Sequence, residues 1–132
     1  MSSVLQQGPL PAVVHGVIEY AAGVLFIVAP FLFSFEDNSA TAASVVVGLM
    51  LLAFTATSRL PTGLVRGIPS GVHATVDVVA AVVLVALPFI LGFTEEGAPT
   101  TLFIGLGVAH LLITIATRFP PRTGSGEPAS TL

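Results

Sequence analysis

The fold of this chain is decided by the stretch PAVVHGVIEYAAGVLFIVAPFLFSF, residues 11–35, and by its copy 58 positions later, PSGVHATVDVVAAVVLVALPFILGF, residues 69–93. Each stretch is apolar for about the 20 residues that an α-helix needs to cross the hydrocarbon core of a bilayer. Each also has a histidine and an acid four positions apart near its start, and a proline near its end. The match predicts a duplicated membrane-spanning unit.

The composition agrees with a membrane protein. Of the 132 residues, 54% are hydrophobic and 8% are charged, and the mean hydropathy is +0.99. This is more apolar surface than one small soluble core can bury. The apolar runs are continuous rather than alternating, which excludes a membrane β-barrel. We therefore expect helical spans at about residues 12–35, 40–58, 71–93 and 99–118.

The second span of each unit is also repeated. One extra residue in the second loop moves the offset to 59, after which TATSRLP (residues 55–61) matches TIATRFP (residues 114–120). Each unit holds an even number of spans, so both copies have the same orientation. We predict an all-α fold: an integral membrane four-helix bundle made of two tandem two-helix repeats, related by a pseudo-twofold axis along the membrane normal.

The boundaries of these units follow from composition. Proline and glycine interrupt any helix between the repeats, and the end of the chain is rich in Pro, Gly, Ser and Thr. Pro30 and Pro88 are expected to bend or end their helices. The predicted segments are an N-terminal cytoplasmic segment (1–11), repeat 1 (12–60), a cytoplasmic linker (61–70), repeat 2 (71–119) and a disordered cytoplasmic tail (120–132).

The charges predict the orientation. All basic residues follow the second or the fourth span, and only acids follow the first and the third. Because short cytoplasmic loops are enriched in Lys and Arg, both termini and the linker are predicted to be cytoplasmic. No patch is basic enough to bind nucleic acid. The basic residues are Arg59, Arg66, Arg118 and Arg122, and the acids are Glu36, Asp37, Glu95 and Glu96.

Five ionisable residues lie within the spans, and each costs roughly 2.5 to 3.5 kcal/mol on insertion scales. Positions i and i+4 share a helix face, so the two polar faces are expected to meet in a central seam in the cytoplasmic half. A structural interpretation is that the His/acid pairs are hydrogen-bonded, with Arg59 and Arg118 reaching back to neutralise the acids and Thr55 and Thr114 filling the remaining bonds. The five residues are His15, Glu19, His73, Asp77 and His110.

Ligand binding is the alternative interpretation of the same residues. Two histidines and two carboxylates suit Zn, Mn or Fe. Paired His15 and His73 on parallel helices suggest haem b. A proton or quinone site is the third possibility, because such groups mark relays in membranes. His110 breaks the symmetry, because its counterpart in the first repeat is a leucine.

No motif of a catalytic site is present. The chain has no cysteine, no nucleophile elbow and no phosphate loop, so we do not expect an enzyme, and the structural interpretation needs no cofactor. Gly105 and Gly107 in FIGLGV are predicted to be close-packing positions in the fourth span.

The repeated unit resembles the SPW-repeat family of small bacterial membrane proteins. IPSGVHATVD (residues 68–77) is similar to the Ile-Pro-x-x-x-His-x-x-x-Asp start of that family's second repeat, and the resemblance covers about residues 12–119. The Ser-Pro-Trp motif itself is replaced by APF at residues 29–31 and LPF at 87–89. The resemblance implies a paired two-helix membrane domain and no established reaction.

Together these observations predict a non-enzymatic protein of the bacterial cytoplasmic (inner) membrane. It would be an accessory or scaffolding subunit, in contact with the lipid bilayer and with other membrane protein subunits or further copies of itself. The alternative is an electron- or proton-transfer membrane protein that binds haem, a metal or a quinone at the His/acid cluster.

Overall fold

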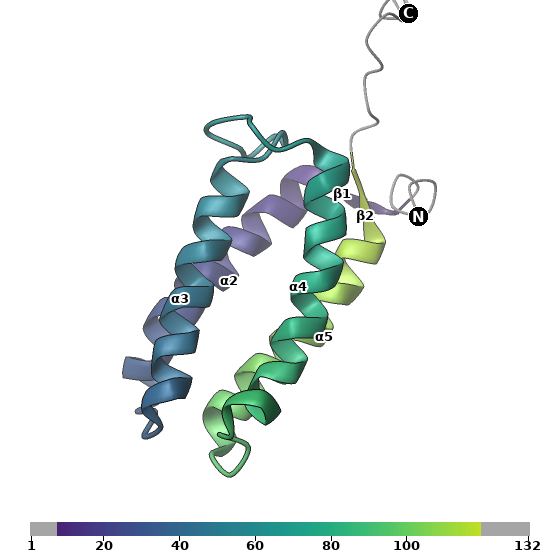
Figure 1. Ribbon diagram of the computed structural model, residues 1–132. Coiled ribbons are helices and arrows are strands. Elements are labelled where there is room, and N and C mark those ends of the chain that lie inside the picture. Colours follow the sequence, from purple (N-terminus) through teal and green to yellow (C-terminus); the bar gives the residue numbers. More distant parts are fainter. Residues whose placement is uncertain (1–7, 120–132) are drawn as a thin grey trace, which may run out of the picture.

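The computed structural model describes residues 8–119 and consists mainly of four long helices (Figure 1). Each helix is long and apolar enough to cross a membrane. The predicted all-α four-helix bundle is therefore confirmed. The predicted tail at 120–132 and most of the N-terminal segment lie outside the described residues. In chain order the elements are β1 (Leu10–Pro11), α2 (Ala12–Leu32), α3 (Asn38–Ala56), α4 (Ser70–Leu91), α5 (Gly97–Ala116) and β2 (Thr117–Arg118).

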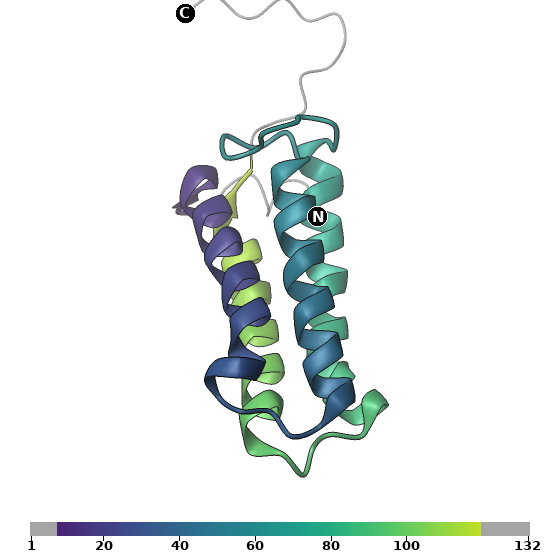
Figure 2. The ribbon, with the colours of Figure 1, turned by 90° about the vertical axis from the view of Figure 1, so that its left-hand side faces the viewer.

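The helices form two hairpins, one for each repeat. α2 packs along α3, and α4 packs along α5, while lighter contacts join α2 to α5 and α3 to α4 (Figures 1 and 2). We call the end that holds residues 57–69 the linker end, and the end that holds residues 33–37 and 92–96 the loop end. Figure 1 shows the linker end at the top and both tight loops at the bottom. The first helices of the two repeats therefore run in the same direction.

Short backbone pairings connect the repeats at the linker end. β1 pairs in parallel with β2, and Leu10 lies opposite Thr117. The equivalent residues of the repeat pair likewise, since Ile68 forms a parallel bridge with Ser58. The start of each repeat is thus joined to the end of the other, as a pseudo-twofold axis along the bundle requires. Sequence patterns did not indicate these pairings, because two residues are too few to show a strand period.

Apolar side chains pack on both sides of the ionisable residues. Towards the loop end, Phe103 contacts Phe26 and Phe93 edge-on, with ring centroids 5.2 and 5.3 Å apart. Towards the linker end, Leu60 and Phe119, which are equivalent in the two repeats, are 1% and 3% exposed. The larger core cluster is Phe26, Ala40, Leu51, Leu84, Phe93 and Phe103, and the smaller is Ala12, Leu60, Ala74 and Phe119.

Glycines let the helices of each hairpin approach closely. A Cβ atom at Gly48 would lie 2.5 Å from the carbonyl oxygen of Gly23 and 2.6 Å from Ile27 Cγ1. A Cβ atom at Gly107 would lie 2.8 Å from Val85 Cγ2, so the prediction for this glycine is correct. The same prediction is wrong for Gly105, where an added Cβ atom would meet no other part of the bundle within 4 Å. Gly105 lies on the outward side of α5, two positions from the close contact.

Proline positions coincide with the ends of the first and third helices. α2 ends at Leu32, two residues after Pro30, and α4 ends at Leu91, three residues after Pro88. Each proline carbonyl accepts a hydrogen bond from a repeat-related phenylalanine N–H, from Phe35 at 2.9 Å and from Phe93 at 3.0 Å. The helices therefore end a few residues before the predicted limits of 35 and 93.

The two tight loops contact each other at the loop end. The Glu96 carboxylate accepts hydrogen bonds from the backbone N–H groups of Glu36 (2.7 Å) and Asp37 (3.0 Å). The Asp37 side chain caps α3 by accepting from the Ser39 hydroxyl and from the Ala40 N–H. These hydrogen bonds, that of Ser39 first, lower the pKa of Asp37. Glu96 therefore links the two hairpins far from the ionisable residues of the spans.

Candidate functional site

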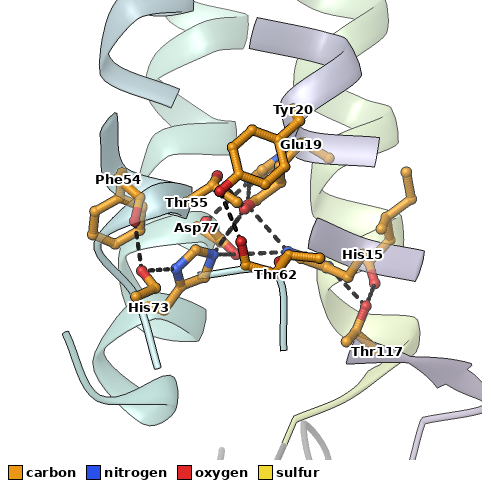
Figure 3. Close-up of polar contacts among 12 residues, drawn as sticks. His15, Glu19, Tyr20, Phe54, Thr55, Thr62, His73, Asp77 and Thr117 are labelled. Atoms are coloured by element: carbon orange, nitrogen blue, oxygen red, sulfur yellow. Dashed lines mark hydrogen bonds and ion pairs between the residues drawn. The ribbon is translucent and has the colours of Figure 1, made fainter. Parts of the chain in front are cut away.

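The five ionisable residues predicted from the sequence meet in one buried cluster. His15 and Glu19 come from α2, His73 and Asp77 come from α4, and His110 comes from α5. The first four residues are at most 1% exposed, and His110 is 8% exposed. Because each His/acid pair occupies positions i and i+4, one helix face points both groups at the axis between the repeats (Figure 3). We call these five residues the polar cluster.

Four atoms of the polar cluster form a nearly regular ring. His15 Nε2 lies 3.1 Å from Glu19 Oε1 and 3.0 Å from Asp77 Oδ2. His73 Nε2 lies 3.1 Å from each of the same two oxygens. One oxygen of each acid is therefore shared by both imidazoles, and each imidazole bridges the two repeats (Figure 3).

The second oxygen of each acid has a further contact. Thr55 donates a hydrogen bond of 2.7 Å to Glu19 Oε2, which also lies 3.0 Å from His73 Nε2. His110 Nε2 lies 3.3 Å from Asp77 Oδ1 and 3.7 Å from Glu19 Oε1, distances that suit an ion pair but not a well-aligned hydrogen bond. The two repeats thus support their acids differently.

This difference follows from side-chain length. Thr114 is the counterpart of Thr55, yet its Oγ1 has no hydrogen-bond partner among the described residues. Asp77 is one methylene shorter than Glu19 and does not reach Thr114. His110 replaces the leucine of the first repeat, Leu51, and brings a nitrogen to the acid instead. The asymmetry seen in the sequence therefore has a geometric cause.

Hydroxyl groups set the orientation of both imidazoles. His15 Nδ1 lies 2.8 Å from Thr117 Oγ1, and His73 Nδ1 lies 2.5 Å from Ser58 Oγ. Each hydroxyl already donates its only hydrogen, at 2.6 Å, to the backbone carbonyl four residues earlier. The hydroxyls must therefore accept from the imidazoles, and we assign a hydrogen to Nδ1 of both rings.

The assignment limits what the other ring nitrogen can be. With a hydrogen on Nδ1, each Nε2 either carries a second proton or presents a lone pair. A lone pair facing two ionised carboxylate oxygens at about 3 Å is repelled unless a proton on a carboxyl group or a cation lies between them. The cluster is therefore either closed by protons, as imidazolium–carboxylate or neutral imidazole–carboxylic acid pairs that sum to zero charge, or a set of four ligands around a cation.

The predicted role of the arginines is wrong. Arg59 and Arg118 are exposed, and Arg59 donates to the backbone carbonyl of Arg66 at 3.2 Å. Within residues 8–119, the ion pairs of Glu19 and Asp77 are all with histidines. Since the acids are already paired inside the bundle, the guanidinium groups stay at the polar end of the helices, where they remain hydrated.

Aromatic rings enclose the imidazoles. Phe54 stacks on His73 with ring centroids 4.5 Å apart, and Phe119 meets His15 edge-on at 5.1 Å. These apolar neighbours keep the dielectric around the cluster low, which strengthens the attraction between its opposite charges.

Sequence reasoning missed Ser58 and Thr117 as site residues. A signal was present, because a hydroxyl residue precedes the repeated arginine in both copies. Its meaning depends on the pairing of Ser58 with Ile68 and of Thr117 with Leu10, which brings each hydroxyl beside the histidine of the other repeat.

Four apolar spans around a buried cluster of histidines and carboxylates define a multi-pass membrane protein built from two helical hairpins. The family model of the SPW repeat domain matches residues 13–117, and the chain therefore belongs to the SPW repeat family. No curated protein and no solved structure matches it.

The residues that replace the family's Ser-Pro-Trp motif lie at the loop end. Pro30 and Pro88 are buried, whereas the side chains of Phe31 and Phe89 are 73% and 66% exposed. The aromatic position of the motif thus points away from the bundle, near the depth at which aromatic side chains anchor helices in a bilayer.

Proposed function

We propose that this protein is a non-enzymatic accessory or scaffolding subunit of the bacterial inner membrane, which packs against other membrane protein subunits. The observation that carries the proposal is that the polar groups of the spans face one another inside the bundle. The outward faces present apolar side chains, and the loops joining the helices of each hairpin are short.

A groove on the second repeat supports a protein partner. The groove lies between α4 and α5, has a volume of about 310 Å³ and is lined entirely by apolar residues. Small residues at its floor would let a partner helix approach closely, which is how helices associate in lipid. Its lining residues are Ala81, Val82, Val85, Ala86, Phe89, Gly107, Val108 and Leu111.

Copurification from native membranes in mild detergent tests this proposal. We expect a stoichiometric protein to accompany the wild-type chain, and we expect Val82→Trp, which fills the groove, to release it. Val24→Trp is the matched control, because Val24 is similarly exposed but lies on α2. A monodisperse monomer without a partner would refute the proposal, and an assembly of identical chains would identify the partner as a further copy.

Electron or proton transfer on a bound group is the second candidate function. The polar cluster favours it, because ionisable groups this deep are typical of relay and cofactor sites. Among the candidate groups, a metal ion fits better than haem. The rings of His15 and His73 have centroids 5.9 Å apart, and the two carboxylates occupy the position that an iron porphyrin would need.

An absorption spectrum of the purified protein tests the second candidate. A Soret band that disappears in the His15→Ala, His73→Ala double variant would support haem, and a redox-active metal lost in the same variant would support electron transfer. A colourless protein without redox-active metal would remove this candidate.

A further inference from the structure

We propose that His15, Glu19, His73 and Asp77 form a closed four-coordinate site for one zinc(II) ion that clamps the two repeats together. The proposal concerns the polar cluster alone and does not depend on the accessory role. The metal content of the protein can be measured whether or not a partner protein is bound.

The ring geometry is close to that of a four-coordinate ion. Its four neighbouring ligand distances are 3.0 to 3.1 Å, and the ligand atoms of the four residues all lie within 4.8 Å of one another. Four ligands at zinc's usual bond lengths of about 2.0 to 2.2 Å are separated by about 3.3 to 3.6 Å in a tetrahedron. Neighbouring ligand atoms are therefore a few tenths of an ångström closer than tetrahedral coordination requires, and opposite atoms, which lie within 4.8 Å of each other, would adjust on binding.

The charges of the site match a divalent ion. Glu19 and Asp77 supply two negative charges, and the neutral imidazoles supply two Nε2 lone pairs. A divalent cation makes the whole set neutral, which a buried site in a membrane span requires. It also removes the repulsion between each lone pair and the carboxylate oxygens around it.

The groups around the ring hold each ligand in position. Thr117 and Ser58 accept from Nδ1 of His15 and His73, which directs both Nε2 atoms to the ring centre. Thr55 donates to Glu19 Oε2, which also lies 3.0 Å from His73 Nε2, and so fixes the rotation of this carboxylate. Ligands of structural and catalytic metals are oriented by this kind of outer contact.

His110 provides an independent indication of a ligand. Its side chain is 9% exposed and lies against the cluster, yet its Nε2 has no hydrogen bond among the described residues. It lies 3.3 Å from Asp77 Oδ1, the oxygen that does not belong to the ring. A metal bound to Asp77 Oδ2 would fix the position of this carboxylate. His110 Nε2 could then donate a hydrogen bond to the free oxygen, Asp77 Oδ1.

The donor set selects the metal. Two imidazole nitrogens and two carboxylate oxygens are donors that suit four-coordinate zinc(II), whereas calcium and magnesium prefer six or more oxygen ligands. All four positions are filled by protein atoms and enclosed by Phe54 and Phe119, so no position is open for substrate. Closed four-ligand sites are structural rather than catalytic.

Metal binding to the full, untagged chain in mild detergent is the direct test. The protein is stripped with a chelator, and zinc(II) or cobalt(II) is then titrated into it. We expect one ion per chain, with cobalt(II) giving the intense visible absorption of four-coordinate geometry. Intact helical circular dichroism and a monodisperse elution profile show that each sample is folded.

Three variants separate a specific site from general metal affinity. Glu19→Gln removes a ligand charge at constant size and should abolish stoichiometric binding. Thr55→Val removes only an outer contact and should weaken binding about 10- to 100-fold. Ser44→Ala is the matched control, because it removes another buried α3 hydroxyl, one that bonds the Phe26 carbonyl outside the cluster, and should leave binding unchanged.

The outcomes that overturn the proposal are equally definite. Folded wild-type protein that takes up no ion, or only weak and substoichiometric ions, would show that the cluster is paired by protons alone. Glu19→Gln with wild-type affinity would place the ion elsewhere. An equal loss in Thr55→Val and Ser44→Ala would mean that general packing, and not ligand orientation, controls binding. If Glu19→Gln fails to fold, the comparison of metal affinity between Thr55→Val and Ser44→Ala still tests the proposal, since only the first should be weakened.

Discussion

Each histidine of the ring donates its Nδ1 hydrogen to a hydroxyl from the other repeat. Thr117→Val keeps the shape of the side chain but leaves the His15 N–H without an acceptor. We expect a loss of about 0.6 to 1.7 kcal/mol in the free energy of unfolding, the range of polar contacts within bilayers. Unfolding of the purified protein in mixed micelles measures it.

Thr75→Val is the control for this prediction. The Thr75 hydroxyl is exposed and bonds only the Gly71 carbonyl of its own helix. Its replacement should change the free energy of unfolding by less than that of Thr117. Equal effects of the two variants would show that the contact with His15 adds nothing to stability.

The length of Asp77 and the presence of His110 are coupled. Asp77→Glu alone should crowd His110, at a cost of about 1 to 3 kcal/mol for overpacking. His110→Leu alone removes the group that faces Asp77 Oδ1. The double variant copies the first repeat, where the longer acid reaches the threonine, Thr55. Its destabilisation should therefore be at least about 0.5 kcal/mol smaller than the sum of the two single effects.

A double-mutant cycle of unfolding free energies measures this coupling. The four proteins are the wild type, each single variant and the double variant, all in the same detergent. Strict additivity would contradict the explanation of the asymmetry by side-chain length.

Residues of the cluster differed in how well the sequence revealed them. His15, Glu19 and their repeat counterparts could be predicted, because ionisable groups in an apolar run stand out and the spacing of four residues fixes a shared face. The hydrogen-bond and ion-pair partners of the acids could not be predicted, since they depend on which groups the fold brings within about 3 Å. The arginines were assigned wrongly for that reason, and Ser58 and Thr117 were missed.

Helices could be predicted more fully than single contacts. All four spans follow from run length, and their ends agree within a few residues. The pairing of β1 with β2 could not be predicted, because it joins chain segments more than a hundred residues apart without a hydrophobic period. The prediction of close packing was correct for Gly107 and wrong for Gly105. Two positions apart on a helix, the residues point in different directions, and only Gly107 faces α4.

Packing between α2 and α3 should be sensitive at Gly48. Gly48→Ala places a Cβ atom 2.5 Å from the Gly23 carbonyl oxygen, which forces the helices apart. We expect a loss of about 1 to 3 kcal/mol in the free energy of unfolding. Gly105→Ala is the matched control: its Cβ would contact nothing within 4 Å, and it should be neutral or stabilising by up to about 1 kcal/mol through helix propensity. Equal destabilisation of both variants would rule out the close approach as the cause.

The whole molecule is two hairpins joined at both ends. The polar cluster connects them near the linker end, and Glu96 connects them at the loop end through the N–H groups of Glu36 and Asp37. Contacts between the hairpins are otherwise lighter than those within them. The duplicated sequence could predict this division into units, whereas the Glu96 contact required the relative placement of the two loops.

Orientation in the membrane is the property of the whole molecule that the charges alone predict. The linker carries Arg66 and the second tight loop carries Glu95, and both side chains are exposed at opposite ends of the bundle. Since short loops rich in arginine stay in the cytoplasm, Glu95 should face the outside and Arg66 the inside. The chain contains no cysteine, so single cysteines introduced at these positions label without background.

A thiol reagent that does not cross membranes tests this orientation in intact bacterial cells. Glu95→Cys should react before the cells are broken, and Arg66→Cys only afterwards. Reaction of both variants after lysis is the control for accessibility. The reverse pattern would place both termini outside and would show that the arginines do not set the topology. Labelling of both variants in intact cells would mean that the chain inserts in two orientations, as expected if so few arginines provide too small a bias.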